Sequence, residues 1–373
     1  MNRENWLWYA NVLGFSAPNA GAALREYETP NALLAAKNDA VLPVLTPMQQ
    51  EVLKSTSPLD FIKTLQSCEK QGVGIVTYAE SAYPDALREI PSPPLVLYYK
   101  GDIGILNQYF LFAMIGTRRP SGYGQEVTRD LSKALTAAGL VLVSGLADGL
   151  DSEAHRAAVA AEAPTVACLA FGHGFCYPAA NRTLKGVIEQ IGVTVSEYPP
   201  DIGPQKQYFL ARNRIIAGLS RGLCVAEARK ASGTMNTVAA ALEYGKDVFA
   251  VPGSIYSPLS EGTNALLREG ATPVTSAQDI LDAYAISYAG DDAGKASCLG
   301  FSFSADALLV KAHLSPVPKS IETLCNETKM SPAKVMACLT ELELSNAARQ
   351  LAGRQFIIGD TAAAQDADEE EFE

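Results

Sequence analysis

The sequence contains few of the residues from which metal sites and disulfide scaffolds are built. Its 373 residues include three histidines and seven cysteines, an odd number with no C-x-x-C pair. Closely spaced Cys and His residues are the usual ligands of structural zinc, and regularly spaced even sets of cysteines are typical of secreted disulfide scaffolds. We therefore expect a reduced, cytoplasmic protein that holds neither a metal nor a cofactor.

Long apolar runs are also missing. A membrane-crossing helix needs about 18 or more consecutive apolar residues, and no such run occurs in the chain. The opening segment, MNRENWLWYANVLGF, lacks the uninterrupted apolar stretch of a signal peptide. Apolar residues make up 48% of the chain, which is enough for a large core. We therefore expect a folded protein that makes no contact with a membrane.

Positive charge is scarce overall but concentrated in one place. The chain has 30 Lys and Arg against 41 Asp and Glu, a net charge of −11, which argues against a protein that coats nucleic acid over a broad surface. Residues 203–235 nevertheless hold a single acid, Glu227, and an aromatic, Phe209. The six cations of this window are Lys206, Arg212, Arg214, Arg221, Arg229 and Lys230. The window predicts a confined site for a polyanion, most simply nucleic acid.

The pattern of apolar runs predicts an α/β protein. Residues 1–75 contain amphipathic helix-length segments broken by prolines and indicate a small helical domain, and residues 76–104 read as a connecting segment. Residues 105–285 then alternate helix-length segments with six short apolar runs, FLFAMIG, LVLVSG, TVACLAFG, VTVSEYP, LCVAEA and DVFAVPG. Strands that are apolar on both faces and alternate with helices predict a Rossmann-like parallel sheet.

The C-terminal part has the outline of a winged helix. Residues 286–303 are polar and are expected to form a linker, and residues 304–360 predict three helices, the second starting at Ser320 and the third at Ser331-Pro332. Two short strands should form the wing, Ala348–Leu351 and Gln355–Ile358. The tail, residues 361–373, is strongly acidic and is expected to be disordered.

Right-handed crossovers bring the loops that follow parallel strands to one edge of the sheet, where α/β folds bind ligands. The loop of residues 116–124 combines glycines with Arg118 and Arg119, but its spacing is not that of a dinucleotide-binding turn. A tight turn explains these glycines without requiring two arginines. The loop ending in Ser232, Gly233 and Thr234 opens a helix and offers further donors to a phosphate.

The helix expected to begin near Phe209 carries the most specific pattern. Phe209, Arg212 and Asn213 are spaced to share one helical face, and Lys206 precedes them. An aromatic ring that stacks on a base, flanked by cations that meet phosphates, is how proteins bind single-stranded nucleic acid. This pattern predicts that the helix forms one wall of the binding site.

The remaining loops indicate binding and not catalysis. Ser144, Asp151 and His155 could be imagined as a catalytic triad, but Ser144 lacks a G-x-S-x-G elbow, so a capping or buried hydrogen-bonding role is expected for Asp151 and His155. No acid–base pair, metal set or activated nucleophile is found among the loops. Further residues expected to line the pocket are Arg119, Gly172, His173, Gly174, Asn181 and Gly253.

Seven blocks resemble the DNA-processing protein A (DprA/Smf) family in order and spacing: GTRRPSGYG, SGLADGLDSEAH, FGHGFCYPAAN, SEYPP, FLARNRIIAGLS, EARKASGTMNT and VFAVPGS. The resemblance implies a non-enzymatic protein of bacterial natural transformation. Such proteins bind and protect incoming single-stranded DNA and load a RecA-type recombinase onto it. It also implies a homodimer formed through the Rossmann-like domain, a SAM-like N-terminal domain and a C-terminal winged helix.

Carried over by motif, the resemblance implies a DNA-binding set made of Gly116, Thr117, Arg118, Lys206, Phe209, Arg212, Asn213, Ser232 and Gly233. Thr117 stands where the family usually has Ser and keeps the hydroxyl. Asp148 stands where a basic residue is common and makes that side of the pocket more acidic. Residues 305–360 contain as many acids as bases, so the winged helix has no strong basic footprint.

Two enzymatic alternatives use the same scaffold. The chain is similar in layout to LOG-type phosphoribohydrolases, whose P-G-G-x-G-T-x-x-E block carries a catalytic Glu, but residues 237–241 here supply no carboxylate. A nicotinamide-dependent oxidoreductase would need the dinucleotide glycine spacing and an acid for the ribose, and both are missing. The sequence therefore favours a DNA-binding protein.

Overall fold

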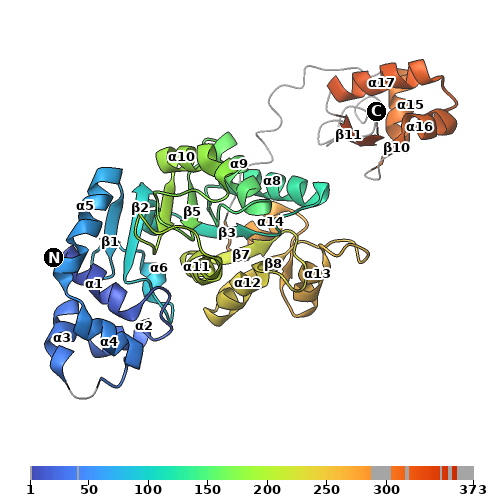
Figure 1. Ribbon diagram of the computed structural model, residues 1–373. Helices are drawn as coiled ribbons and strands as arrows, with labels where there is room; N and C mark the ends of the chain where they lie inside the picture. The colour runs from blue at the N-terminus through green and yellow to red at the C-terminus, as the bar shows by residue number, and fades with distance from the viewer. Residues whose placement is uncertain are drawn as a thin grey trace, which may run out of the picture. The chain divides into compact units, whose positions relative to one another are not determined.

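A computed structural model describes residues 2–39, 42–286, 304–315, 319–344, 347–351 and 355–358. These residues fall into two compact units, Met1–Tyr288 and Ala289–Glu373 (Figure 1). Residues 287–303 of the expected linker and the expected acidic tail lie outside the described residues. No helix among the described residues has both the length and the apolar character needed to cross a membrane.

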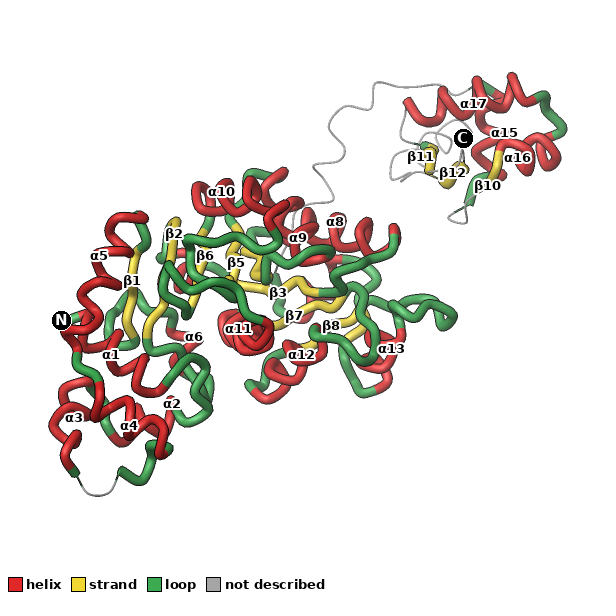
Figure 2. The backbone as a smooth tube through the Cα atoms, in the orientation of Figure 1, coloured by secondary structure: helices red, strands yellow, loops and turns green. Residues whose placement is uncertain are grey.

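A nine-stranded sheet in the order β1-β2-β6-β5-β4-β3-β7-β8-β9 forms the centre of the first unit (Figure 2). Its strands are β1 Gly74–Thr77, β2 Val96–Gly101, β3 Leu111–Ile115, β4 Val141–Ser144, β5 Thr165–Leu169, β6 Val193–Ser196, β7 Gly222–Val225, β8 Asp247–Ala250 and β9 Thr272–Pro273. Strands β3 to β9 all pair in parallel, and β3 to β7 are buried along their whole length. The predicted Rossmann-like sheet is thereby confirmed.

Two strands extend this sheet beyond the parallel core. β1 pairs antiparallel with β2, and β2 pairs antiparallel with β6. Both lie within or next to residues 76–104, which we expected only to connect two domains. Because β2 completes its hydrogen bonds on β6, this segment belongs to the central sheet and adds two antiparallel strands to the parallel core predicted for residues 105–285.

Helices cover both faces of the sheet (Figure 1). α11 and α12 pack on one face through residues such as Ile215 and Val238, and α8, α9 and α14 pack on the other through Leu135, Ala154 and Ile280. The helices of the parallel core are α8 Gly122–Ala137, α9 Leu150–Ala160, α10 Arg182–Ile191, α11 Lys206–Leu219, α12 Thr234–Glu243, α13 Glu261–Arg268 and α14 Ala277–Ala283. A short 3-10 turn, η3 Ala179–Asn181, precedes α10.

The N-terminal helices pack against β1 and β2. They are α1 Arg3–Leu13, α2 Ala20–Glu26, α3 Pro30–Ala35, α4 Pro47–Ser55 and α5 Ile62–Gln71, with 3-10 turns η1 Ala36–Asn38 and η2 Pro58–Phe61. Two short helices, α6 Asp85–Arg88 and α7 Ile105–Gln108, follow. One apolar cluster joins Trp8 and Leu53 of the helices to Tyr98 of β2, so the helical region and the sheet share a core.

The second unit contains three helices, α15 Ala305–His313, α16 Ile321–Thr328 and α17 Pro332–Leu344, and a sheet in the order β10-β12-β11. Its strands are β10 Lys319–Ser320, β11 Ala348–Leu351 and β12 Gln355–Ile358. The Ser320 hydroxyl accepts from the backbone N–H of Thr323, as expected for a helix start. Both wing strands have the predicted bounds, and the winged-helix prediction is confirmed.

Candidate nucleic-acid interface

A cleft of about 410 Å³ opens at the carboxyl ends of β3 and β7. The chain crosses there from one half of the sheet to the other, since β3 lies between β4 and β7, and ligands of α/β folds bind at such a switch point. All nine residues of the predicted DNA-binding set line the cleft: Gly116, Thr117, Arg118, Lys206, Phe209, Arg212, Asn213, Ser232 and Gly233. Two separate loops and the first half of α11 therefore contribute this set to a single cavity.

The rim of the cleft, defined here by Arg118, Lys206 and Phe209, is the part that a polyanion can reach. The guanidinium carbon of Arg118 lies 5.2 Å from the centre of the Phe209 ring, a cation–π distance. Arg118 and Lys206 are exposed, and neither pairs with a carboxylate among the described residues. The rim thus presents two unneutralised cations together with a half-buried aromatic ring.

The loop that carries Arg118 is held by Glu227, the single acid of the basic window. The buried Glu227 carboxylate accepts hydrogen bonds from the Ser121 backbone N–H at 3.0 Å and from the Ser121 hydroxyl at 2.6 Å. Its carbonyl oxygen accepts from the Thr117 N–H at 2.8 Å. A Cβ at Gly124 would lie 2.2 Å from the same carboxylate, which explains the glycine there. Glu227 therefore shapes the rim without opposing its charge.

Arg212 lies in the floor of the cleft and is only 3% exposed. Its Nη1 donates to the carbonyl oxygen of Gly145 at 2.6 Å and also to that of Cys168. A Cβ at Gly145 would lie 2.5 Å from this guanidinium, so a glycine is needed for the close approach. We expected Arg212 to grip phosphates; instead its guanidinium joins the loop that follows β4 to strand β5.

Asp151 shares this buried floor. Its Oδ2 accepts from the Gly145 backbone N–H at 3.2 Å. Burial raises the pKa of Asp151, and the neighbouring Arg212 opposes this rise. Burial likewise lowers the pKa of Arg212, with Asp151 acting against it. The two side chains thus form a buried, mutually stabilising pair whose charges face each other below the cleft.

Arg214, the second arginine of the same motif, lies outside the cleft. It is buried and forms an ion pair of 2.6 Å with Glu197, at the end of β6. The Glu197 carboxylate also accepts from the backbone N–H and the hydroxyl of Ser16. Glu197 lies outside the basic window, so the sequence pattern counts Arg214 as a free cation. Its charge is neutralised in the fold and contributes nothing to the rim.

The loop after β4 is held by backbone contacts with the first loop. Gly149 has φ +80°, and a Cβ there would lie 2.3 Å from the Thr117 carbonyl oxygen, which also accepts from the Leu150 N–H at 3.2 Å. Gly149 occupies the N-cap of α9, and Asp151 has the second of the two roles expected for it, a buried hydrogen bond from the Gly145 N–H. The buried hydrogen-bonding role predicted for His155 is confirmed, since its Nδ1 lies 2.8 Å from Thr165 Oγ1. Burial lowers its pKa to about 3.

None of the six further residues that we expected in the lining belongs to the cleft. Arg119 is exposed, and its N–H donates to Thr117 Oγ1. Gly172 packs against the carbonyl of Pro199, and the Gly174 N–H donates to the Pro200 carbonyl. The Gly253 N–H donates to Asn264. These residues belong to turns next to the cleft. Phosphate-binding loops are also glycine-containing turns, which is why the sequence suggested that these glycines line the pocket.

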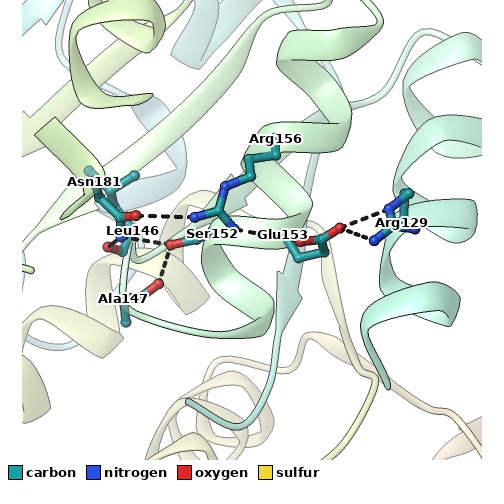
Figure 3. A network of polar contacts seen from close by, with 7 residues as sticks. All are labelled: Arg129, Leu146, Ala147, Ser152, Glu153, Arg156 and Asn181. Carbon is teal, nitrogen blue, oxygen red and sulfur yellow. Dashed lines mark hydrogen bonds and ion pairs between the residues drawn. The ribbon is translucent and has the colours of Figure 1, made fainter. Parts of the chain in front are cut away.

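His173 and Asn181 are buried supports. His173 Nε2 lies 3.1 Å from Thr194 Oγ1, and burial lowers its pKa to about 3, so the ring is neutral. Asn181 Nδ2 donates to the Leu146 carbonyl and to the Ser152 hydroxyl, at 3.0 and 2.7 Å (Figure 3).

An exposed arginine continues the Asn181 network towards α8. Arg156 contacts Asn181 Oδ1 at 3.4 Å and Glu153 at 3.5 Å, and Glu153 in turn bonds Arg129 at 2.8 Å (Figure 3). The network joins α8, α9 and the start of α10, and so fixes the loop after β4 beneath the cleft.

The structure adds lining residues that sequence reasoning missed, among them Ala147, Leu210, Ile216 and Thr237. Thr237 is one helical turn beyond Thr234, and Ile216 is one turn beyond Asn213, so helical spacing would have found both. Asn213 Nδ2 donates to the Gly233 carbonyl at 3.3 Å and links the two sides of the cleft. The Ser232 hydroxyl is buried without a hydrogen-bond partner in the protein.

Comparison with known proteins agrees with this geometry. A family model described as DNA recombination-mediator protein A matches residues 74–285, and one described as the DprA winged helix domain matches residues 302–354. The chain is 38% identical to DNA processing protein DprA of Bacillus subtilis over 220 residues, which are 59% of this chain and 74% of that protein. It is 44% identical to the Streptococcus pneumoniae DprA over 202 residues, 54% of this chain and 71% of that protein.

Two solved structures are similar. The X-ray structure of S. pneumoniae DprA aligns with a TM-score of 0.64 at 34% identity and covers 74% of this chain and 96% of that one. A structure of Helicobacter pylori DprA, reported for its single-stranded DNA binding mode, aligns with a TM-score of 0.53 at 33% identity and covers 58% and 97%. The chain therefore belongs to the DNA recombination-mediator protein A family, also called DprA/Smf.

Proposed function

We propose that the cleft binds single-stranded DNA. The observation that carries the proposal is the rim, where Arg118 lies over the Phe209 ring and Lys206 stands at the start of the same helix. Guanidinium and ammonium groups bind phosphates, and a half-exposed ring accepts a stacked base of any identity. The unpartnered Ser232 hydroxyl supplies a further hydrogen-bond donor inside the cleft.

The acidity of the rest of the chain limits binding to this cleft. With a net charge of −11, the surface as a whole repels DNA, so only a strand that enters between the rim cations gains favourable contacts. A cleft of about 410 Å³ admits a base and its phosphates but not a duplex. We expect sub-micromolar, salt-sensitive binding of oligo-dT and much weaker binding of duplex DNA.

In the cell, we propose that the protein holds and protects incoming single strands during natural transformation. It would load a RecA-type recombinase onto them, acting as a homodimer through the Rossmann-like domain and without catalysing a reaction. Family membership and the DNA-binding mode reported for the H. pylori relative support this role. Recombinase filament formation on strands coated with single-stranded DNA-binding protein should require the wild-type cleft.

The cleft chemistry favours binding over nucleotide hydrolysis. Asp151 is the one carboxylate in the lining of the cleft, and it is buried, bonded to a backbone N–H and opposed by Arg212. A general base must reach the group from which it takes a proton, and this carboxylate faces the floor. Hydrolysis of a nucleoside monophosphate by the wild type, lost in Asp151→Asn, would overturn this part of the proposal.

The test uses two adjacent exposed arginines. Arg118→Ala should weaken oligo-dT binding by about 1–3 kcal/mol, the range for a charge-assisted phosphate contact. Arg119→Ala removes the same charge one residue away, outside the cleft lining, and should bind within about twofold of wild type. Fluorescence anisotropy with a labelled oligo-dT measures both. Equal effects of the two substitutions, or none from either, would refute the site.

A further inference from the structure

The aromatic surface continues beyond the cleft. Tyr177, on the loop after β5, lies with its ring centre 5.5 Å from that of Phe209 in an edge-on arrangement, and its side chain is 50% exposed. The Phe209 ring therefore contacts both Arg118 and Tyr177. The loop after β5 reaches the same edge of the sheet as the cleft, because β5 is parallel to β4 and β6.

A second exposed ring follows on the same loop. Phe175 is 42% exposed and packs against the segment that leads into α11, since a Cβ on Gly203 would lie 3.7 Å from its ring. Phe175 also borders a hollow of about 320 Å³ that is lined by Arg182, Lys185 and Glu189. The loop after β5 thus carries two exposed aromatic rings, Phe175 and Tyr177, of which Tyr177 contacts the half-buried Phe209 of the cleft.

An unpaired cation follows the loop that carries these rings. In the hollow beside Phe175, Lys185 and Glu189 pair at 2.9 Å, while Arg182 is exposed and forms no ion pair among the described residues. Arg182 therefore keeps a positive charge that can attract a phosphate of a strand leaving the cleft along this loop.

We propose that the loop of residues 173–181 is a second DNA-binding subsite, in which Tyr177 stacks on the base next to the one held at Phe209. Arg182 then meets a phosphate of the departing strand. Successive bases stack on successive aromatic side chains in proteins that bind single strands without sequence preference, and each ring tolerates any base. This inference rests on the proposed function and adds a second base-stacking position to it.

The binding test compares two tyrosines of equal exposure. Tyr177→Ala should weaken binding of an oligo-dT by about 5- to 150-fold, the effect of losing one stacked base, and Tyr177→Phe should bind like wild type because the ring is retained. Tyr109→Ala is the matched control, since Tyr109 is 49% exposed but precedes β3 and so lies at the opposite edge of the sheet. It should have no effect on binding.

A fluorescence measurement distinguishes a base that stacks at position 177 from an indirect effect in which the substitution of Tyr177 loosens Phe209. The two native tryptophans, Trp6 and Trp8, are buried at 3% and 0% exposure, so Tyr177→Trp places the single exposed indole among the described residues. Saturating oligo-dT should quench its fluorescence strongly and leave that of Tyr109→Trp unchanged. A base that does not stack there would leave the Tyr177→Trp emission unchanged, and the inference would be wrong.

The outcomes distinguish the two proposals. If Arg118→Ala weakens binding while Tyr177→Ala does not, the cleft binds DNA and the second subsite is refuted. If neither substitution has an effect, the proposed function itself fails. Arg182→Ala should lower affinity for long oligonucleotides and reduce the dependence of log affinity on log salt by about 0.7, the value for one single-strand phosphate contact.

Discussion

Arg118 and Lys206 at the rim of the cleft, and Arg212 and Arg214 beneath it, are cations that the sequence does not tell apart. The first two are exposed and unpaired, whereas the other two are buried and bonded, Arg212 to the carbonyls of Gly145 and Cys168 and Arg214 to Glu197. All except Arg118 belong to one basic window. Counting the charges of that window therefore overestimates what a ligand meets.

The difference follows from the helix that carries them. The first turns of α11 border the cleft, and its second half, from Arg214 to Leu219, is buried against the sheet. A buried guanidinium must have its N–H groups satisfied and its charge compensated, and it therefore acts as a structural link. An exposed guanidinium carries a charge that a ligand can reach. The same residue type thus divides into fold-forming and DNA-binding roles along one helix.

The largest expected effect is on stability, from Arg214→Ala. Removing one partner of a buried ion pair leaves Glu197 uncompensated and should lower the free energy of unfolding by about 3–5 kcal/mol. Urea unfolding measures it, and oligo-dT affinity of the folded protein should stay unchanged. The control replaces both partners, Glu197→Gln with Arg214→Met, and should recover most of the stability. A stable Arg214→Ala variant with weakened DNA binding would contradict the division of roles.

Lowering the pH should affect the stability of the buried region and leave DNA binding at the rim of the cleft unchanged. His155 and His173 are buried with pKa values lowered to about 3, below the ordinary 6.5. Their contribution to stability is complete above pH 6.5 and is lost as the pH falls towards 3, because the unfolded chain binds the protons first. Each histidine should lower the free energy of unfolding by about 1.4 kcal/mol for every pH unit in this range.

Urea unfolding between pH 7 and 5 tests this expectation, and His173→Gln should reduce the slope by about half, the share of one of two histidines. Burial raises the pKa of Asp151, so that group acts in the opposite sense, its stabilising contribution being complete at acid pH and lost as the pH rises. Affinity of the folded protein for oligo-dT should not follow this loss, since the rim carries guanidinium and ammonium groups. Stability that does not change from pH 7 to 5 would contradict the prediction.

Within the basic window, two lysines give a sharper comparison. Lys206→Ala should weaken oligo-dT binding by about 1–3 kcal/mol and reduce the salt dependence by about one phosphate contact. Lys230→Ala removes an exposed charge that does not line the cleft and should stay within about twofold of wild type. Titrations at several salt concentrations measure both. Equal losses would mean that the window acts through its total charge and not through the cleft.

The smallest expected effect distinguishes two serines. Ser232→Ala removes the unpartnered hydroxyl in the cleft and should reduce DNA affinity by about 0.5–1.5 kcal/mol without changing stability. Ser121→Ala removes a hydroxyl that accepts from the Gly124 N–H at the start of α8 and donates to the buried Glu227 carboxylate, and it should lower stability by about 1–3 kcal/mol, more than it lowers affinity. Anisotropy should show the larger loss for Ser232→Ala, and urea unfolding the larger loss for Ser121→Ala. Equal losses of the two variants in both measurements would contradict the prediction.

Much of the fold is predictable because its signals are local. The β-branched apolar runs became β3 to β8, Ser320 caps its helix, and the two wing strands have the predicted bounds. The nine residues of the cleft could also be predicted, because strand ends of a parallel sheet meet at one edge and the motifs fall at those ends. β1 and β2 were not recognised as part of the sheet, since pairing of β2 with β6 joins segments far apart in the chain.

The sequence by itself determined the α/β architecture, the loops that meet and the residue types at their tips, because periodicity and turn chemistry act over a few neighbours. Tertiary structure alone decided which cations remain free. The partners of Arg212 and Arg214 are distant in sequence, Cys168 in β5 and Glu197 just after β6, and burial is a property of the assembled layers. The tertiary structure also placed Tyr177, on the loop after β5, against Phe209 of α11, a contact that no local pattern encodes.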